Sequence, residues 1–165
     1  MWIRSETRAD HAAIHRVVEA VFAGAAHASG TEARIVDALR ETDALSLSLV
    51  ADIDGRIAGH AALSPVPPED GAHGWYGLGP VAVDPRDQGH GVGSALVRAA
   101  LAELPRMGAA GCVVLGDPAY YARFGFRARA SLHYPGAPAG CFMALPLGDA
   151  VPRGSVAYPS AFSAA

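Results

Sequence analysis

The stretch that decides the fold is VAVDPRDQGHGVGSALVRAAL, residues 81–101. It begins with the apolar alternation of a strand, breaks at Asp84-Pro85, and continues as a helical pattern after the alternating glycines Gly89–Gly93. Glycine has no Cβ, so the backbone can turn sharply there or come close to a ligand. The first turn of a helix offers unpaired N–H groups and a partial positive charge, which suit a phosphate. The stretch therefore predicts a phosphate-binding turn between a strand and a helix.

Three phosphate-binding motifs compete for the segment QGHGVG within this stretch. The Walker motif requires a lysine after its last glycine and is excluded, because the chain contains no lysine. The dinucleotide fingerprint requires a third glycine where Leu96 stands, and it normally follows the first strand of a domain rather than the fourth. The pattern that remains is Q-x-x-G-x-G, formed by Gln88, Gly91 and Gly93.

Upstream of the turn, the periodicity predicts a short strand at 2–4 and an amphipathic helix through 14–22. Thr31 is a candidate N-cap for a second, shorter helix. Two strands joined at Asp54-Gly55 then form a hairpin. Residues 75–84 form a fourth strand.

Within that fourth strand, we expect a bulge or splay at Gly79-Pro80. Proline has no N–H group to donate to a neighbouring strand, so regular pairing cannot continue through it. The main chain of the residues that follow is then free to pair with something else.

Downstream, the helix after the glycines is expected to end at Pro105, and residues 111–115 read as a buried strand. Asp117 as N-cap and Gly125 past the end then specify a short helix, and 141–147 form the last strand. This order of strands and helices predicts an α/β (α+β) fold with a mixed sheet covered by helices.

The composition suits one domain, because 165 residues with 51% hydrophobic content can bury a sizeable core. We expect that domain to cover 1–147, with a C-terminal tail at 148–165 that is ordered if Tyr158 and Phe162 dock on it. A net charge of −3 gives no basic field, so no nucleic-acid partner is expected.

The location is expected to be cytoplasmic, with no membrane partner. The N-terminus has no apolar run of signal-peptide length, and charged residues or proline interrupt every long apolar run. Cys112 and Cys141 lack the spacing of metal ligands, so we expect reduced, buried thiols and no metal.

The segment VAVDPRDQGHGVGSALV, followed downstream by YYARFGF, resembles the GNAT superfamily of N-acetyltransferases. YYARFGF is similar to the family's F-Y-x-x-x-G-F segment, and the resemblance covers essentially the whole chain. The segments GTEARIVDALR, LSLVADIDGRIAGH, LGPVAV and GSVAYPSAF further resemble a bacterial subgroup of predicted acetyltransferases with poorly defined substrates. The resemblance implies the GNAT fold, whose mixed, mostly antiparallel sheet splays after the fourth strand, and it implies acetyl-CoA as cosubstrate.

The resemblance also implies which residues hold acetyl-CoA. Main-chain groups of Val81 and Val83 would pair with the pantetheine arm, and the Val81 N–H would polarise the thioester carbonyl. N–H groups from 89 to 94 would surround the pyrophosphate, assisted by the helix dipole. The residues at this site are Gln88, Gly89, His90, Gly91, Val92, Gly93 and Ser94.

Tyr121 matches the family's tyrosine, which protonates the departing CoA thiolate. Alternatively, Tyr121 is a tyrosine that packs on a short helix and has no catalytic role. The sequence departs from the family pattern at Val114, where a frequent asparagine is absent.

The general base is not identified by the sequence. His60 is one candidate, placed by strand alternation on the face opposite Ile57 and Leu63, although a mid-strand histidine is more often structural. The loop residues Glu69, Asp70 and His73 are the other candidates, acting directly or through water.

Glu32 and Arg34 begin the second helix, which in this superfamily often borders the acceptor site. They are therefore candidate substrate-binding residues. They are equally consistent with a solvated first turn, where glutamate is favoured by the helix dipole.

The predicted function is acetyl transfer to a primary amine by direct attack in a ternary complex, because neither cysteine has basic neighbours that would activate it. The acceptor is a small amine or a protein amino group. Two rivals stay open: a catalytically silent CoA-binding sensor or interaction module, and an acyltransferase using a longer acyl-CoA. Homodimers are common in the superfamily, and the sequence does not decide this point.

Overall fold

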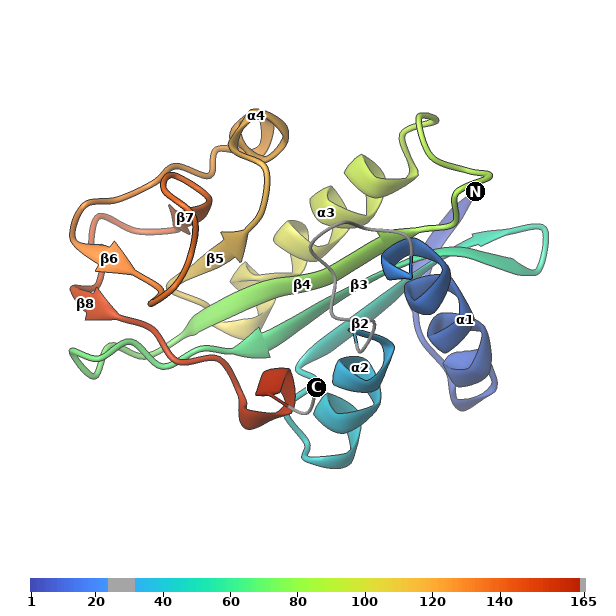
Figure 1. Cartoon of the computed structure of the whole chain (residues 1–165), viewed down its shortest axis with the longest axis horizontal. Helices are drawn as coiled ribbons and strands as arrows, with labels where there is room; N and C mark the ends of the chain where they lie inside the picture. Colours follow the sequence, from blue (N-terminus) through green and yellow to red (C-terminus); the bar gives the residue numbers. More distant parts are fainter. Residues whose placement is uncertain (24–31, 164–165) are drawn as a thin grey trace.

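The computed structural model describes residues 1–23 and 32–163, and within this part of the chain six strands form one mixed sheet (Figure 1). Neighbouring strands are antiparallel except β4 and β5, which are parallel. The predicted mixed, mostly antiparallel sheet is confirmed. The strand order across the sheet is β1 (Trp2–Ser5), β2 (Leu47–Ile53), β3 (Arg56–Pro65), β4 (Trp75–Val83), β5 (Gly111–Leu115) and β7 (Phe142–Pro146).

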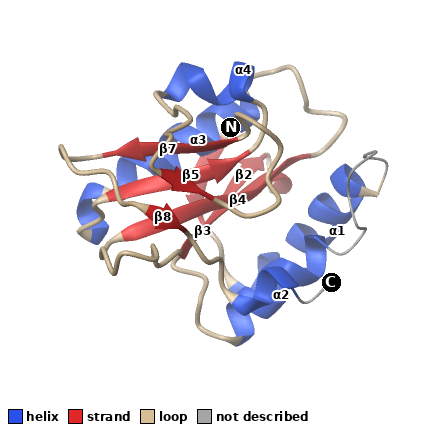
Figure 2. Cartoon of the chain, turned by 60° about the vertical axis from the view of Figure 1, so that its left-hand side comes forward, coloured by secondary structure: helices blue, strands red, loops and turns tan. Residues whose placement is uncertain are grey.

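Helices cover both faces of the sheet (Figure 2). On one face, α1 (His11–Phe22) and α2 (Glu32–Glu41) pack on Val50 and Ala82. On the other face, α3 (Val92–Glu103) packs through an apolar stripe against the opposite side of β2, β3 and β4. The buried residues of that stripe are Val92, Leu96, Val97 and Ala100. The helical periods read from the sequence thus correspond to buried faces.

The described residues also contain short 3-10 segments, which lie next to α-helices or, in the case of the last, in the C-terminal tail. They are η1 (Arg8–Asp10), η2 (Pro105–Met107), η3 (Ala122–Phe124) and η4 (Ser160–Ser163). The helix α3 ends before Pro105, as expected from the sequence. The predicted N-cap Thr31 lies outside the described residues.

The fourth strand is paired on both sides along its first half and on one side along its second half. Its pairing with β5 ends at Leu78 opposite Val114, whereas its pairing with β3 continues to Val83. The register with β3 shifts at Gly79-Pro80, where β4 has one more residue than its partner. In Figure 1, β4 continues past the end of β5, whose chain rises instead to α4 (Pro118–Tyr121). The expected bulge and splay are confirmed.

The short helix α4 begins at the N-cap residue that the sequence predicts. The Asp117 carboxylate accepts a hydrogen bond from the Ala119 N–H at 2.9 Å, and Pro118 occupies the first helical position. The chain continues through η3 to Gly125, whose φ of +96° is the left-handed conformation that favours glycine.

The tail from 148 to 163 returns along the molecule and packs on it, although its sequence has no strand or helix period. Its strand β8 (Gly154–Ser155) pairs with β6 (Leu132–His133). The Glu69 carboxylate accepts hydrogen bonds from the Ser155 N–H at 2.9 Å and from its hydroxyl at 3.1 Å. Its last turn, η4, lies beside α2 (Figure 1). The tail therefore brings its side chains close to the sheet.

Candidate active site

A cleft of about 350 Å³ opens where β4 gives way to α3. We call it the glycine-loop cleft. Its walls come from the end of β4, the loop after it, the first turn of α3 and the short helix α4. The lining residues are Val83, Asp87, Gln88, Gly89, Gly91, Val92, Gly93, Ser94, Tyr120 and Arg123.

The loop has a glycine, with no side chain, at each of its two positions of positive φ. Gly89 and Gly91 have φ angles of +79° and +84°, and a Cβ at either position would project into open space. Gly91 is the N-cap of α3 and has no side-chain cap, so the first-turn N–H groups are left to the cleft. This arrangement fits a pyrophosphate, because bare amides and the positive end of a helix converge on one space.

The loop is fastened to the strands on both of its sides. The Gln88 Nε2 donates to the Val83 carbonyl at 3.0 Å, and Asp87 forms an ion pair with Arg56 at 2.8 Å. Asp84 pairs with Arg86 at 2.9 Å, and hydrogen bonds from Arg86 lower the pKa of Asp84 to about 2. Gln88 thus holds the loop against β4 while it lines the cleft.

The His90 ring is exposed and does not line the cleft, so the predicted place of this residue among the pyrophosphate ligands is through its main-chain N–H. Its Nδ1 lies 3.4 Å from the Asp87 carbonyl.

The predicted site residues did not include three that line the cleft, namely Asp87, Tyr120 and Arg123. The Tyr120 hydroxyl lies 3.5 Å from Ser94 Oγ, and the Arg123 guanidinium lies 4.5 Å from the centre of the Tyr120 ring. Arg123 Nε also donates to the Tyr120 carbonyl at 2.9 Å, which holds the charge on this wall. The available signal was an arginine one turn after a tyrosine on a helix predicted to follow β5.

Beside the cleft, β4 presents main-chain groups on the edge that β5 does not pair, where the Val83 carbonyl already accepts a hydrogen bond from Gln88. The Asp84 N–H donates to the Ala58 carbonyl at 2.7 Å, and hydrogen-bonding direction alternates along an antiparallel pair. The N–H and C=O groups of Val81 and Val83 therefore point away from β3, towards the side that β5 has left. This edge leads from the glycine loop to the bulge at Gly79-Pro80.

At the bulge lies a second hollow of about 210 Å³, which we call the apolar pocket. Segments far apart in the sequence meet there, including the start of α2, the ends of the β4–β5 pairing and the C-terminal tail. The lining residues are Glu32, Ile35, Leu78, Gly79, Pro80, Leu115, Tyr134, Tyr158 and Phe162. Among the described residues, Glu32 is the one charged side chain that lines it.

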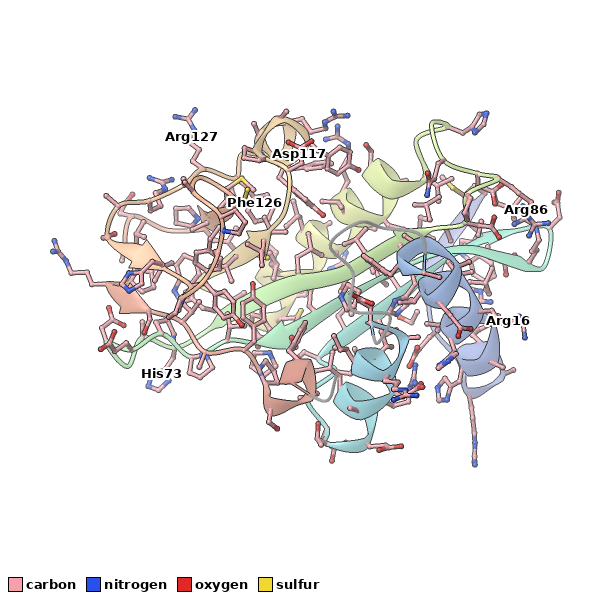
Figure 3. All side chains as sticks on the ribbon, viewed as in Figure 1. Arg16, His73, Arg86, Asp117, Phe126 and Arg127 are labelled. Carbon is pink, nitrogen blue, oxygen red and sulfur yellow. The ribbon has the colours of Figure 1, made fainter. Side chains whose placement is uncertain are left out.

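Of the two predicted substrate-binding residues, the structure brings Glu32 to this pocket and leaves Arg34 exposed on α2. The loop candidates for a base lie elsewhere. Glu69 and Asp70 accept hydrogen bonds from the tail backbone, which lower their pKa values. His73 precedes β4 and lies at the opposite end of the sheet from Arg86 (Figure 3).

Tyr121 is the last residue of α4, with its ring against Gly116 and an edge-to-face contact with Phe126 at 5.9 Å. Burial raises the pKa of its hydroxyl to about 12, so the group carries its proton at neutral pH. A protonated hydroxyl is the form that an acid requires. The residue does not belong to the lining of either hollow.

His60 is fully buried on the sheet face covered by α1 and α2. Its Nε2 lies 2.8 Å from Ser48 Oγ, which donates in turn to Glu6 at 2.7 Å. Burial lowers the pKa of the ring to about 4, and the residue does not line either hollow.

The expected position of Ile57 on the face opposite His60 is wrong. Ile57 belongs to the same buried cluster as Val50 and Ala82, the residues paired with His60. A register shift between β2 and β3 at Ala51 inverts the alternation between these positions.

Both cysteines are free thiols. Cys112 is buried as expected, and burial raises the pKa of its thiol. Cys141 is partly exposed, contrary to the expectation of a buried side chain, because it precedes β7 in a turn at the surface. Among residues 1–23 and 32–163, no group of three or more histidine, cysteine or acidic side chains could hold a metal ion.

A comparison with family models matches residues 10–126 to the acetyltransferase (GNAT) family. The chain belongs to this family. A GNAT family acetyltransferase from Brucella melitensis, solved in complex with acetyl-CoA, is 48% identical, with a TM-score of 0.88 over 98% of this chain and 97% of that one. The YhbS acetyltransferase of Escherichia coli, solved with CoA, is 35% identical, with a TM-score of 0.88 over 98% of this chain and 91% of that one.

In a sequence comparison, the uncharacterized N-acetyltransferase YhbS of Escherichia coli K12 is 44% identical over 99 residues, which are 59% of each chain. The match thus spans less than two thirds of this curated relative. The predicted GNAT membership and fold are confirmed by these comparisons. In the described part of the chain, every helix is too short or too polar to span a membrane.

Proposed function

We propose that this GNAT protein transfers an acetyl group from acetyl-CoA to a primary amine by direct attack in a ternary complex. The observation that carries the proposal is the layout along β4. A bare, amide-rich turn ends the strand, an unpaired strand edge precedes that turn, and a pocket lies at the bulge. These features suit a pyrophosphate, an extended arm and an acceptor, in that order.

Each part of acetyl-CoA is bound by a different set of residues along β4 and the loop that follows it. N–H groups from Gly89 to Ser94 hold the pyrophosphate, with the α3 dipole and Arg123 adding positive potential. Main-chain groups of Val81 and Val83 hold the pantetheine arm as an added strand. The cleft fits this ligand because a Cβ at Gly89 or Gly91 would occupy the space that the phosphates need.

When bound, acetyl-CoA supplies a thioester whose carbonyl carbon accepts the amine nitrogen and whose thiolate departs. The Val81 N–H donates a hydrogen bond to the carbonyl oxygen, which stabilises the charge that develops there. The Tyr121 hydroxyl donates its proton to the departing sulfur, and the proton that the amine nitrogen loses passes to solvent, from which the hydroxyl is restored. The pocket holds the acceptor so that its nitrogen faces the β4 edge.

The base that deprotonates the amine is not part of this proposal. The role predicted for His60 stays a prediction. The ring is buried and lines neither hollow, so it has no direct contact with the space where an acceptor would bind. Cytoplasmic location also stays a prediction, and homodimerisation stays undecided.

The test is a thiol-release assay with acetyl-CoA and a panel of primary amines, with mass spectrometry of the products. The proposal expects an acetylated amine formed in equal amount to the free thiol. A protein that binds acetyl-CoA and releases no thiol with any amine would be the silent CoA-binding module. Thiol release with hexanoyl-CoA well above that with acetyl-CoA would identify a longer acyl group as the donor.

A further inference from the structure

The apolar pocket has a wall that the catalytic proposal does not use. Three aromatic rings from separate parts of the chain stand in a row along it. Tyr134 and Tyr158 have ring centroids 5.0 Å apart, and Tyr158 and Phe162 are also 5.0 Å apart. All three line the pocket. Two of them belong to the C-terminal tail.

The position of this wall is fixed. A Cβ on Gly77 of β4 would stand 2.7 Å from the Tyr158 ring, so the ring lies directly on the strand. The tail before it is fastened by Glu69 to Ser155 and by Asp70, which accepts from the Arg153 N–H at 2.9 Å. After it, η4 packs on Ile35 and Leu39 of α2. The rings are therefore held in place before any ligand arrives.

The pocket is also small, and its lining in the described part of the chain contains one carboxylate. Its volume of about 210 Å³ lies below the roughly 300–1,000 Å³ of sites for drug-sized ligands, which limits an occupant to about one ring and a short chain. Glu32 supplies a carboxylate at its edge. A flat apolar body gains contact area on the aromatic wall, and a cationic group gains attraction from the carboxylate.

We infer that this pocket selects primary amines whose body is an aromatic or compact apolar group, with Tyr158 and Phe162 of the tail as specificity-determining residues. The inference rests on the proposed function and names its class of acceptor. A carboxylate in the lining favours an amine over a longer acyl chain, because an acyl chain has no positively charged group to place near it.

The test compares 2-phenylethylamine with ethanolamine, which has the same primary amine on a small polar body. Both are titrated into protein saturated with CoA, and kcat/KM for both is measured with acetyl-CoA. We expect 2-phenylethylamine to bind and react at least about 10-fold better, which is about 1.4 kcal/mol. In Phe162→Ala this preference should fall below about 3-fold, mainly through a higher KM for 2-phenylethylamine.

A matched pair of leucines provides the control. Leu115 lines the pocket and Leu147 does not, yet each is 43% exposed. Leu115→Gln should reduce the preference for 2-phenylethylamine, and Leu147→Gln should leave it as in the wild type. This pair keeps the test valid if Phe162→Ala loosens the tail.

The outcomes separate the two proposals. Acetylation of both amines with equal kcat/KM would overturn the inference and leave the proposed function standing. Tight, Phe162-dependent binding of 2-phenylethylamine without any turnover would support the pocket and overturn the proposed function. A preference for hexanoyl-CoA that is lost in Phe162→Ala would assign the pocket to the acyl chain and overturn the inference. Failure of both amines to bind or react would overturn it as well.

Discussion

The two hollows along β4 are built from different parts of the polypeptide. The glycine-loop cleft is formed largely by one continuous segment, and the phosphate contacts that we propose there come from main-chain N–H groups. The apolar pocket is formed by side chains from α2, β4, β5, the segment before β7 and the tail. A main-chain site recognises the same chemistry whatever the side chains are, provided they stay small. A side-chain site changes its ligand with each substitution. We therefore propose that the glycine-loop cleft binds the cosubstrate common to the family and that the apolar pocket sets the acceptor specificity of this protein.

The largest expected effect comes from filling the glycine-loop cleft. Gly91→Trp places an indole where the phosphates bind, so acetyl-CoA affinity should fall by more than about 1,000-fold, or about 4 kcal/mol. Isothermal calorimetry measures this loss. Gly55→Trp is the matched control, because Gly55 has a similar φ of +82°, open space around a Cβ, and no place in this cleft. Equal acetyl-CoA affinity in the two variants would mean that the glycine-loop cleft does not bind the cosubstrate.

The next effect concerns Tyr121, the last residue of α4, which lines neither hollow. Tyr121→Phe removes the proton donor and keeps the ring, so kcat should fall by about 100-fold with little change in acetyl-CoA affinity. Tyr120→Phe should instead raise the KM for acetyl-CoA, because its hydroxyl lies beside Ser94 in the cleft. Steady-state kinetics on both variants distinguish the roles. Full kcat in Tyr121→Phe would make this tyrosine a packing residue.

His60 belongs to neither hollow, and its effect should appear in stability. Its pKa of about 4 in the folded protein lies below its ordinary value of 6.5, so the unfolded chain takes up a proton first as the pH falls. The stability that the neutral ring contributes is complete above about pH 6.5 and is lost as the pH falls towards 4.

Between pH 7 and pH 5, this titration should cost about 2 kcal/mol of unfolding free energy. His60→Gln lacks the titration, so its stability should fall by that much less over the same interval. Glu6, whose pKa is lowered, and Arg40 face the same network and are present in both proteins. Urea denaturation at the two pH values measures the difference. Parallel pH curves would contradict this description of the buried ring, and a 100-fold fall in kcat would instead make His60 the base.

The smallest effect concerns charge on the wall of the glycine-loop cleft. Arg123→Gln should weaken acetyl-CoA binding about 5-fold, since an exposed ion pair is worth up to about 1 kcal/mol, and the effect should shrink at high salt. Arg106→Gln removes an exposed arginine that lies outside the cleft and should change nothing. Calorimetry at low and high salt gives both numbers. Equal loss in the two variants would mean that only the overall charge matters.

Much of the cleft could be predicted from the sequence because its determinants are local. Alternation, three glycines and a helical period lie within one stretch, and Gly79-Pro80 marks the bulge next to it. The same holds for α4, where Asp117 and Gly125 define both ends. Each of these features depends on neighbours in the chain.

The apolar pocket could not be predicted in this way. Tyr134, Tyr158 and Phe162 meet Leu78 only because the tail returns across the sheet, and the tail has no period that would place it. The inverted face of Ile57 has a similar cause, since one bulged residue changes every alternation beyond it. Contacts between distant segments, and single-residue shifts within a strand, are not encoded in local patterns.

The most direct test of the main-chain account is an NMR titration of the ¹⁵N-labelled protein with acetyl-CoA. The account predicts that the N–H signals of Val81, Val83 and the glycines at 89, 91 and 93 shift most and become protected from hydrogen exchange. Shifts confined to other parts of the molecule, with these amides unchanged, would contradict it.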